Sequence, residues 1–278
     1  MTIGLPVYNG AATLELALDS LLAQEYRDFR LVISDNASTD ATAAICANRA
    51  GADNRVDYMR QTTNIGAVPN YAAVLRRADT PYFMWAADDD LWEPTFLGTL
   101  VDALEREPAP ALACCDYDVH VHSTGERISH SPDSMPRLDP ALGEVFTVLE
   151  LLRSPQPTLV YGLFRTDRLG RANARRFPDF DFGDLSLLTQ FALNDGIRLV
   201  PQVLFHAGVI DEAREPYSLA HRRLPGFKLS YGPYLRSSLR AIAEHSSLSV
   251  GDRLRLSYAL LRQVVTLAVW HEWRSRRA

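Results

Sequence analysis

The stretch TIGLPVYNG, residues 2–10, decides the fold class of this 278-residue chain. It is an extended apolar run, Thr2–Val7, that passes directly into a polar turn. Leucines at helical spacing follow over residues 11–24, and a strand joined to a helix in this way is the repeating unit of a parallel sheet. The stretch therefore predicts an α/β fold.

The same alternation continues over the first hundred residues. β-like runs and helical patterns follow one another in the order strand 29–34, helix 39–50, strand 56–60, helix 67–77 and strand 82–86. Strands separated by helices pair in parallel. We therefore expect a nucleotide-binding domain with a mainly parallel central sheet.

Polar residues come directly after each of these strands. They form four loops, at residues 6–10, 35–40, 64–66 and 88–90. In a parallel sheet, ligands bind beyond the carboxyl ends of the strands. The four loops should therefore meet at one edge of the sheet and line one pocket.

The pattern changes after residue 107, so three regions are expected: a nucleotide-binding half (1–107), a half that receives the second substrate (108–215) and a C-terminal helical region (216–278). The middle region contains β-like runs at 111–121, 158–164 and 198–205 and a helical pattern at 184–194. The last region contains helical patterns at 219–245 and 250–274.

Composition excludes several classes of protein. A net charge of −5 argues against nucleic-acid binding, which needs a clustered excess of basic side chains. The cysteines, Cys46, Cys114 and Cys115, lack the spacing of a disulfide or zinc framework, which favours a reducing compartment. Neither a signal peptide nor a long apolar span is apparent. We expect a cytoplasmic protein, either soluble or peripheral on the inner face of the cell membrane.

Three consecutive aspartates, Asp88, Asp89 and Asp90, follow the apolar run 82–87. Like charges this close repel one another unless a cation neutralises them, and carboxylate oxygens suit Mg²⁺ or Mn²⁺. The alternative is a solvated acidic turn that caps the helix beginning near Pro94. The residues alone leave both interpretations open.

Asp35 ends a buried strand beside the same predicted pocket. A carboxylate in this position can accept hydrogen bonds from a base or a ribose. The alternative is an Asx-turn, in which the side chain bonds to the backbone of its own loop.

These motifs together resemble family 2 of the glycosyltransferases, with its GT-A fold. The resemblance is carried by residues 6–10 with the leucine-rich helix after them, by 33–40, by 64–66 and by the aspartate cluster. It is strong over about the first hundred residues, weaker to Phe205 and absent beyond. It implies an enzyme that uses a nucleotide-sugar donor, linked to UDP, GDP or dTDP.

The resemblance also implies roles for individual residues. The nucleoside site would be lined by Pro6, Tyr8, Asn9 and Asp35, with Asn64 and Gly66 completing its wall and Asp88 near the ribose. Asp89 would bind the divalent metal, Mn²⁺ or Mg²⁺. Many family members carry an acidic residue where this chain has Ala87, so either Asp88 or Asp90 would assist Asp89.

A general base is required in the second half of such an enzyme, because an acceptor hydroxyl must lose its proton. Asp184, which precedes a helix, is similar to the family's base, with Asp181 and Asp179 as alternatives. From the residues alone, Asp184 would be a helix N-cap or a partner of the helix dipole at its N-terminus.

Histidine can supply an extra metal ligand in GT-A enzymes. His206 is the best candidate for that role, and His221 is the second. His120 and His122 alternate along one predicted strand and could chelate a cation together. The alternative is that all four histidines are ordinary polar side chains without a metal.

The segment from Arg253 to Arg277 has an apolar helical stripe and a basic end. It could lie on an anionic membrane that carries a lipid-linked acceptor. The alternative is that it packs against the catalytic domain or forms a homodimer.

The leading hypothesis is an inverting, metal-dependent glycosyltransferase that transfers a sugar to a saccharide or lipid-linked acceptor during the synthesis of surface polysaccharide or glycolipid. A sugar-nucleotide nucleotidyltransferase would need a basic phosphate-binding loop, but residues 6–12 contain no Arg or Lys. A non-catalytic protein that binds sugar nucleotides or glycans is the other alternative.

Overall fold

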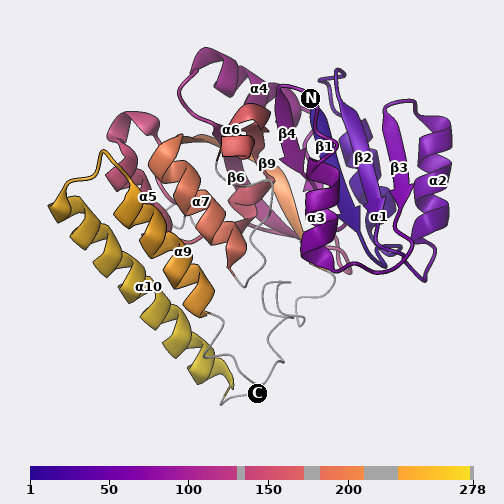
Figure 1. Cartoon of the computed structure of the whole chain (residues 1–278). Coiled ribbons are helices and arrows are strands. Elements are labelled where there is room, and N and C mark those ends of the chain that lie inside the picture. The colour runs from indigo at the N-terminus through magenta and orange to yellow at the C-terminus, as the bar shows by residue number, and fades with distance from the viewer. Residues whose placement is uncertain (130–134, 172–181, 210–230, 276–278) are drawn as a thin grey trace.

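The computed structural model describes residues 1–129, 135–171, 182–209 and 231–275. In these residues an α/β domain is built on one sheet, in the order β3-β2-β1-β4-β8-β6-β9-β5, with β7 added beside β6 (Figure 1). Its pairings are mostly parallel in the first half and mixed in the second. The expected α/β fold with helices at the C-terminal end is confirmed.

The first half follows the predicted alternation closely. Its strands β3, β2, β1 and β4 lie side by side, and all of their mutual pairings are parallel. Its elements are β1 (Thr2–Val7), α1 (Leu14–Leu22), β2 (Arg30–Asp35), α2 (Thr42–Ala52), β3 (Val56–Arg60), α3 (Ala67–Leu75) and β4 (Tyr82–Trp85). All four polar loops therefore begin at the same edge of the sheet.

The second half adds strands of both directions. The elements are β5 (Leu91–Trp92), α4 (Phe96–Arg106), β6 (Leu112–Val121), β7 (Glu126–Ser129), β8 (Leu163–Arg165), α6 (Thr166–Arg171), α7 (Gly183–Asn194) and β9 (Ile197–Val209). The long strand β9 runs parallel to β6 and antiparallel to β5, which directly follows the aspartate cluster. This pairing brings β9 against that cluster.

The expected strand at 158–164 was wrong over most of its length. Residues 157–161 form the 3₁₀ helix η3 (Pro157–Tyr161), and only the short β8 follows it. Pro157 has no N–H for a strand ladder but suits the first position of a helical turn. The helices η2 (Pro140–Leu142) and α5 (Glu144–Arg153) were not predicted. On its inner side α5 buries Val148, Leu151 and Leu152.

Two helices end the described chain, α9 (Tyr231–Glu244) and α10 (Val250–Ser275). Residues 219–230 of the helix predicted over 219–245 lie outside the described residues. Both helices contact α5, α7 or each other on one side of the molecule (Figure 1). Among the described residues no helix is both long and apolar enough to cross a membrane.

Aromatic rings join the two halves of the sheet. Trp85 of β4 is fully buried and meets Phe83 edge-on at 4.9 Å and Phe164 of β8 at 5.5 Å between ring centroids. Phe164 in turn contacts Phe191 of α7 at 5.1 Å. Edge-to-face pairs add to the stabilisation from burial. The core is thus continuous from the nucleotide-binding strands to α7.

Gly162 tests the packing between η3 and the sheet. A β-carbon there would overlap the backbone carbonyl oxygen of Ala113, whereas one at Gly51, near the end of α2, would meet nothing within 4 Å. We expect Gly162→Ala to lower the free energy of unfolding by about 1–3 kcal/mol. Gly51→Ala should leave it unchanged or raise it by up to about 1 kcal/mol, because alanine favours helix. Urea unfolding of both variants measures the difference, and equal stabilities would contradict the described packing.

Candidate active site

The loop after β1 is fastened to the loop after β2. The backbone N–H of Asn9 donates to Ser38 Oγ at 2.9 Å, and its side-chain Oδ1 accepts from Thr39 N–H at 2.8 Å. Asn9 has a φ of 54°, a left-handed conformation that asparagine tolerates. Tyr8 beside it is 47% exposed, so its ring is open to a flat ligand. Pro6 is buried in β1, where it pairs with Ser34.

Asp35 is fully buried at the end of β2, and its carboxylate is held from three directions. It accepts hydrogen bonds from Ser38 N–H at 2.8 Å and Tyr58 O–H at 3.0 Å, and Arg60 Nε lies 3.2 Å away. The side chain thus bonds to the backbone of its own loop, as the alternative interpretation expected, but at the third residue along and not at the second, as in an Asx-turn. Burial, followed by the hydrogen bond to Asp35, raises the pKa of Tyr58 to about 12, so the phenol remains a donor.

The third loop is joined to the second by Asn36, which sequence reasoning missed. Its Nδ2 donates to Asn64 Oδ1 at 2.9 Å and to the Gly66 carbonyl at 3.2 Å, while its Oδ1 accepts from Ile65 N–H at 2.8 Å. Gly66 has a φ of 88°, which a residue with a β-carbon rarely adopts. The structure thus brings Asn64 and Gly66 beside the loop that Asp35 begins.

Asp88 lies against the first loop at Gly10. A β-carbon at Gly10 would overlap the Asp88 carboxylate, so only glycine permits this approach. Burial, followed by the neighbouring charge of Asp89, raises the pKa of Asp88 to about 7. The structure therefore joins the fourth loop to the first, as the sequence predicted.

Asp90 lies deepest of the three aspartates, with 4% of its surface exposed. Its Oδ1 accepts from Gly208 N–H at 2.9 Å, while its Oδ2 is buried without a hydrogen-bond partner in the described part of the chain. Burial raises the pKa of Asp90 well above the usual range, and the charge of Asp89 acts in the same direction. An unpartnered buried carboxylate oxygen is costly and is the kind of atom that a cation satisfies.

The back wall of the aspartate cluster is made by β6 and β9. His122 Nε2 lies 2.6 Å from the Asp89 carbonyl oxygen, to which its N–H donates, and His120 meets His122 ring to ring at 4.9 Å. A β-carbon at Gly208 would overlap that same carbonyl group. His120 and His122 thus contact each other, but His122 donates its hydrogen bond to the backbone of the aspartate cluster.

His206 lies between two carboxylates. Its Nδ1 bonds to Asp118 and its Nε2 lies 2.9 Å from Glu93 Oε1, which also accepts from Arg127 at 3.1 Å. The hydrogen bond from His206 lowers the pKa of Glu93. Neither ring nitrogen of His206 is free for a metal in this arrangement, so the structure gives no support to the predicted ligand role. His221 lies outside the described residues.

Asp184 occupies the first turn of α7, after Phe182 in a left-handed conformation with a φ of 64°. Its Oδ1 accepts from the N–H of Leu185 at 2.7 Å. The N-cap residue is Phe182, so the predicted cap is wrong and Asp184 is instead an acidic residue of the first turn. Burial raises the pKa of Asp184. Burial, followed by the charge of Asp184, raises the pKa of Tyr234 in α9. In the part of the chain described, no hydrogen bond or ion pair joins Asp184 to the aspartate cluster. Asp179 and Asp181 lie outside that part.

Tyr161 of η3 connects the two regions of the site. Burial raises the pKa of Tyr161 well above its usual range, and the charges of Tyr71, Asp90 and Asp89 contribute. Its hydroxyl lies 3.2 Å from that of Tyr71, and η3 packs against α7. The 3₁₀ helix η3 therefore lies between the aspartate cluster and α7, the helix that carries Asp184.

The aspartate cluster fits a divalent cation only in part. Its oxygens are the ligands that Mg²⁺ and Mn²⁺ prefer. Among the described residues, however, no three His, Cys, Asp or Glu side chains converge in the way a protein-only metal site requires. Magnesium sites often use one or two carboxylates and take their other ligands from substrate phosphates. The cluster is suited to that shared arrangement.

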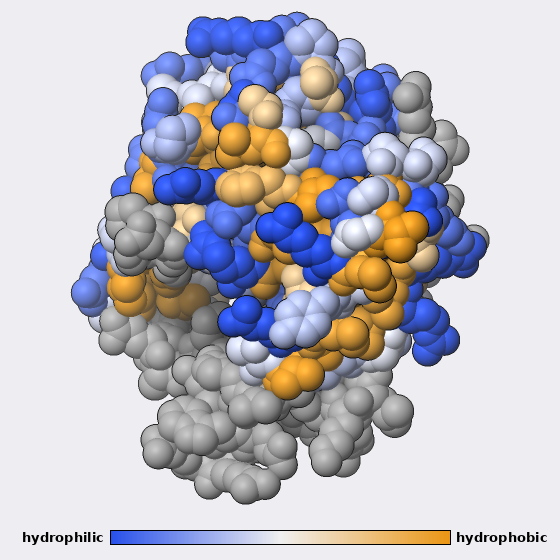
Figure 2. Space-filling model, turned by 90° about the vertical axis from the view of Figure 1, so that its left-hand side faces the viewer, coloured by the Kyte–Doolittle hydropathy of each residue, from blue (hydrophilic) through white to orange (hydrophobic). Residues whose placement is uncertain are grey.

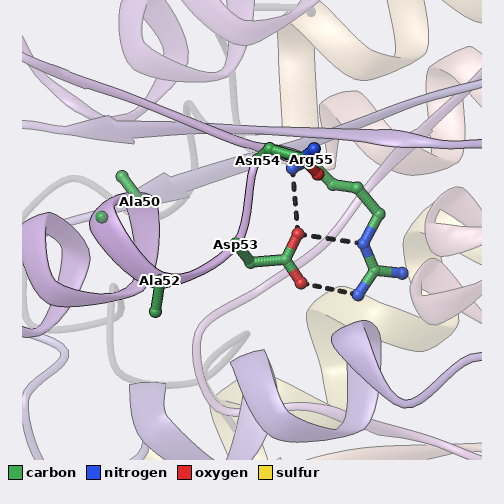
Figure 3. Close-up of a pocket in the computed structure, with 6 residues that line it drawn as sticks. Ala50, Ala52, Asp53, Asn54 and Arg55 are labelled. Atoms are coloured by element: carbon green, nitrogen blue, oxygen red, sulfur yellow. Dashed lines mark hydrogen bonds and ion pairs between the residues drawn. The ribbon is translucent and has the colours of Figure 1, made fainter.

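A separate surface hollow lies at residues 50–55, between α2 and β3 (Figure 3). There Asp53 accepts from Arg55 Nε at 3.1 Å and Nη2 at 2.7 Å, and these bonds lower the pKa of Asp53. The hollow adjoins the amino end of β3, opposite the edge where the loops meet. We interpret the pair as a stabilising contact of this connection.

Gly208 provides a test of the back wall. We expect Gly208→Ala to displace the Asp89 carbonyl and to cost about 1–3 kcal/mol in the free energy of unfolding. Gly98→Ala, in α4 with open space around its new methyl group, is the matched control and should cost nothing. Chemical denaturation gives both values. A Gly208→Ala protein as stable as the control would contradict the close approach of β9.

Comparison with known proteins identifies the family. The model of "Glycosyl transferase family 2" matches residues 2–158. An uncharacterised glycosyltransferase of Rickettsia typhi is 27% identical over 120 residues, which are 43% of this chain and 36% of that protein. Glycosyltransferase GlyA of Streptococcus pneumoniae is 31% identical over 100 residues, 36% of this chain and 14% of that protein. The matched stretch thus spans about a third or less of these curated relatives.

Solved structures share the fold. TarS of S. aureus, in complex with UDP-GlcNAc, superposes with a TM-score of 0.74 at 18% identity over 94% of this chain and 71% of that chain. The mannosyltransferase PcManGT of Pyrobaculum calidifontis, in complex with GDP-Man and Mn²⁺, gives 0.57 at 19% identity over 99% of this chain and 81% of that chain. With the family match over more than half of its length, the chain belongs to glycosyl transferase family 2 and has its GT-A fold.

Proposed function

We propose that this chain transfers a sugar from a nucleoside diphosphate donor to a hydroxyl group of a saccharide or lipid-linked acceptor, with inversion at the anomeric carbon. The observation that carries the proposal is the single sheet edge at which the buried carboxylate of Asp35 and the desolvated aspartates 88–90 lie in loops that contact one another. The proposed pathway is synthesis of a surface polysaccharide or glycolipid in the cytoplasm. The three cysteines, all buried and free, accord with a reducing compartment.

The proposed donor site pairs a hydrogen-bond acceptor with a donor. Asp35 offers carboxylate oxygens, and Arg60, half exposed beside it, offers guanidinium N–H groups. Uracil, thymine and guanine each present an N–H next to a carbonyl, which is the complementary pattern. Tyr8 would lie against the base, and Asn64 and Gly66 would close the wall. The neighbours that bind UDP-GlcNAc and GDP-Man support a donor of this class.

In this proposal Asp89, assisted by Asp88 or Asp90, holds Mg²⁺ or Mn²⁺ together with the donor diphosphate. The cation, when bound, supplies positive charge that stabilises the departing diphosphate. The buried Oδ2 of Asp90 and the raised pKa values of the cluster support this role, because both report unfavourable burial of negative charge without a partner. His122 and Gly208 keep the cluster in place.

Asp184 is the proposed general base. The acceptor oxygen attacks the anomeric carbon, the bond from that carbon to the diphosphate oxygen breaks, and Asp184 takes the hydroxyl proton. Burial raises the pKa of Asp184, which makes the carboxylate a stronger base than an exposed aspartate. Attack from the side opposite the leaving group gives inversion.

Nucleotide binding gives the first test. UDP, GDP or dTDP with Mn²⁺ should raise the Tm, because a ligand that binds only the folded state stabilises it. Asp89→Asn should lose the metal-dependent part of that shift. Asp57→Asn, at an exposed ion pair with Arg30, is the matched control and should keep it. The donor-site proposal fails if no nucleoside diphosphate shifts the Tm in the presence of Mn²⁺.

Asp184→Asn gives the second test. We expect sugar transfer to fall by about 10²–10⁴-fold, while the metal-dependent nucleotide shift remains. Because burial raises the pKa of Asp184, the rate of the parent enzyme should climb as pH rises through that pKa, and this limb should disappear in the variant. Initial rates across pH measure both effects. Full turnover by Asp184→Asn would remove Asp184 from the mechanism.

The same assay separates the alternatives. Release of a nucleoside diphosphate that requires an acceptor supports transfer, whereas release of pyrophosphate supports a nucleotidyltransferase. Binding of sugar nucleotides without turnover supports a non-catalytic protein. The absence of Arg and Lys from residues 6–12 favours transfer over nucleotidyl chemistry.

A further inference from the structure

The outer side of α10 carries a continuous stripe of large apolar side chains. The stripe consists of Val250, Leu254, Tyr258, Leu261 and Val265, which are 74%, 67%, 70%, 45% and 61% exposed. At 100° per residue these five positions fall within an arc of about 80° and extend for about 22 Å along the helix. Isolated exposed apolar residues are ordinary, but an aligned set is not.

The stripe is not the face by which α10 packs onto the protein. That face lies on the other side of the helix, where Leu256 and Leu260 are fully buried and Gln263 accepts from Tyr234 O–H at 2.6 Å. The helix is thus apolar on two sides. Figure 2 looks onto this side of the molecule and shows orange side chains gathered between blue ones. Packing on the catalytic domain, one alternative from the sequence, accounts for only one of the two apolar faces.

Basic side chains border the stripe. Arg255 and Arg262 are exposed along one edge, and neither forms an ion pair within the described residues. Asp252 is the one acidic residue between positions 250 and 267; it projects away from the stripe and bonds to Ser249 at 2.6 Å. Two arginines therefore lie along this edge, with Asp252 as a neighbour of Arg255 at its amino end.

We propose that the stripe docks α10 flat on an anionic lipid bilayer. Helices of this kind insert their apolar face at the boundary between headgroups and acyl chains, while basic residues contact anionic headgroups. Tyr258 suits this depth, because its ring is apolar and its hydroxyl reaches water. This surface goes beyond the catalytic proposal, since it concerns where the enzyme sits and not which sugar it transfers.

A second copy of the chain fits the stripe less well. In a symmetric antiparallel pair, the same edge of each helix lies beside the same edge of its partner. Arg255 and Arg262 of both copies would then line one side of the interface, where their like charges repel one another. Charge complementarity thus favours an anionic lipid surface over self-association.

Vesicle flotation of the full chain tests the proposal. The protein should float with vesicles made of equal amounts of phosphatidylcholine and phosphatidylglycerol, and far less with phosphatidylcholine alone. Leu254→Ser combined with Tyr258→Ser should weaken partitioning about tenfold or more. Arg255→Gln combined with Arg262→Gln should weaken it about fivefold for each arginine on anionic vesicles only.

Controls away from α10 keep the result specific. Leu16→Ser, at a 52% exposed position in α1, and Arg106→Gln, at an exposed position in α4, should leave partitioning unchanged. All these sites are exposed, so circular dichroism should show the same Tm throughout. The proposal is overturned if the wild type does not float, or if the α10 variants float as the wild type does. It is equally overturned if sedimentation without lipid shows a dimer that Leu254→Ser with Tyr258→Ser dissociates.

Discussion

The burial of three consecutive carboxyl groups at one sheet edge is the constraint on which the rest of this structure depends. Burial raises the pKa values of Asp88, Asp89 and Asp90, and the charge of Asp89 also raises those of Asp88 and Asp90, so the charged carboxylates are less stable here than in water. The fold keeps them there with backbone and ring donors from neighbouring strands. Gly208 N–H bonds to one carboxylate, and His122 bonds to the main chain of another. The long strand β9 and its pairing with the short β5 make these bonds possible.

Local patterns allowed much of the first half to be predicted. The strands and helices up to β4, and the meeting of four loops at one edge, follow from short-range periodicity and from the geometry of parallel sheets. Pro157 shows the limit of this reasoning, because the apolar run after it resembled a strand and folds as a 3₁₀ turn. Three contacts of the site, made by Arg60, Asn36 and His122, join residues distant in sequence, and no local pattern indicated them.

The two sides of the site differ in how they are held. The loops around Asp35 are tied to one another by hydrogen bonds, with Asn9, Ser38 and Asn36 as the connecting residues. The second side is held by packing of η3, α7 and α9, in which the ring of Phe182 stacks on Tyr231 at 5.1 Å. Hydrogen bonds among loops thus fix the side near Asp35, whereas packing of helices fixes the side near Asp184.

The contact between Gly10 and Asp88 has a consequence for the evolution of such chains. Two residues 78 positions apart share one small volume, so the freedom of either to change depends on the other. A descendant that gained a side chain at position 10 would still display all three aspartates in an alignment, although the first could no longer occupy its place. The position of Asp88 in such chains therefore depends as much on a glycine without functional groups as on the aspartate itself.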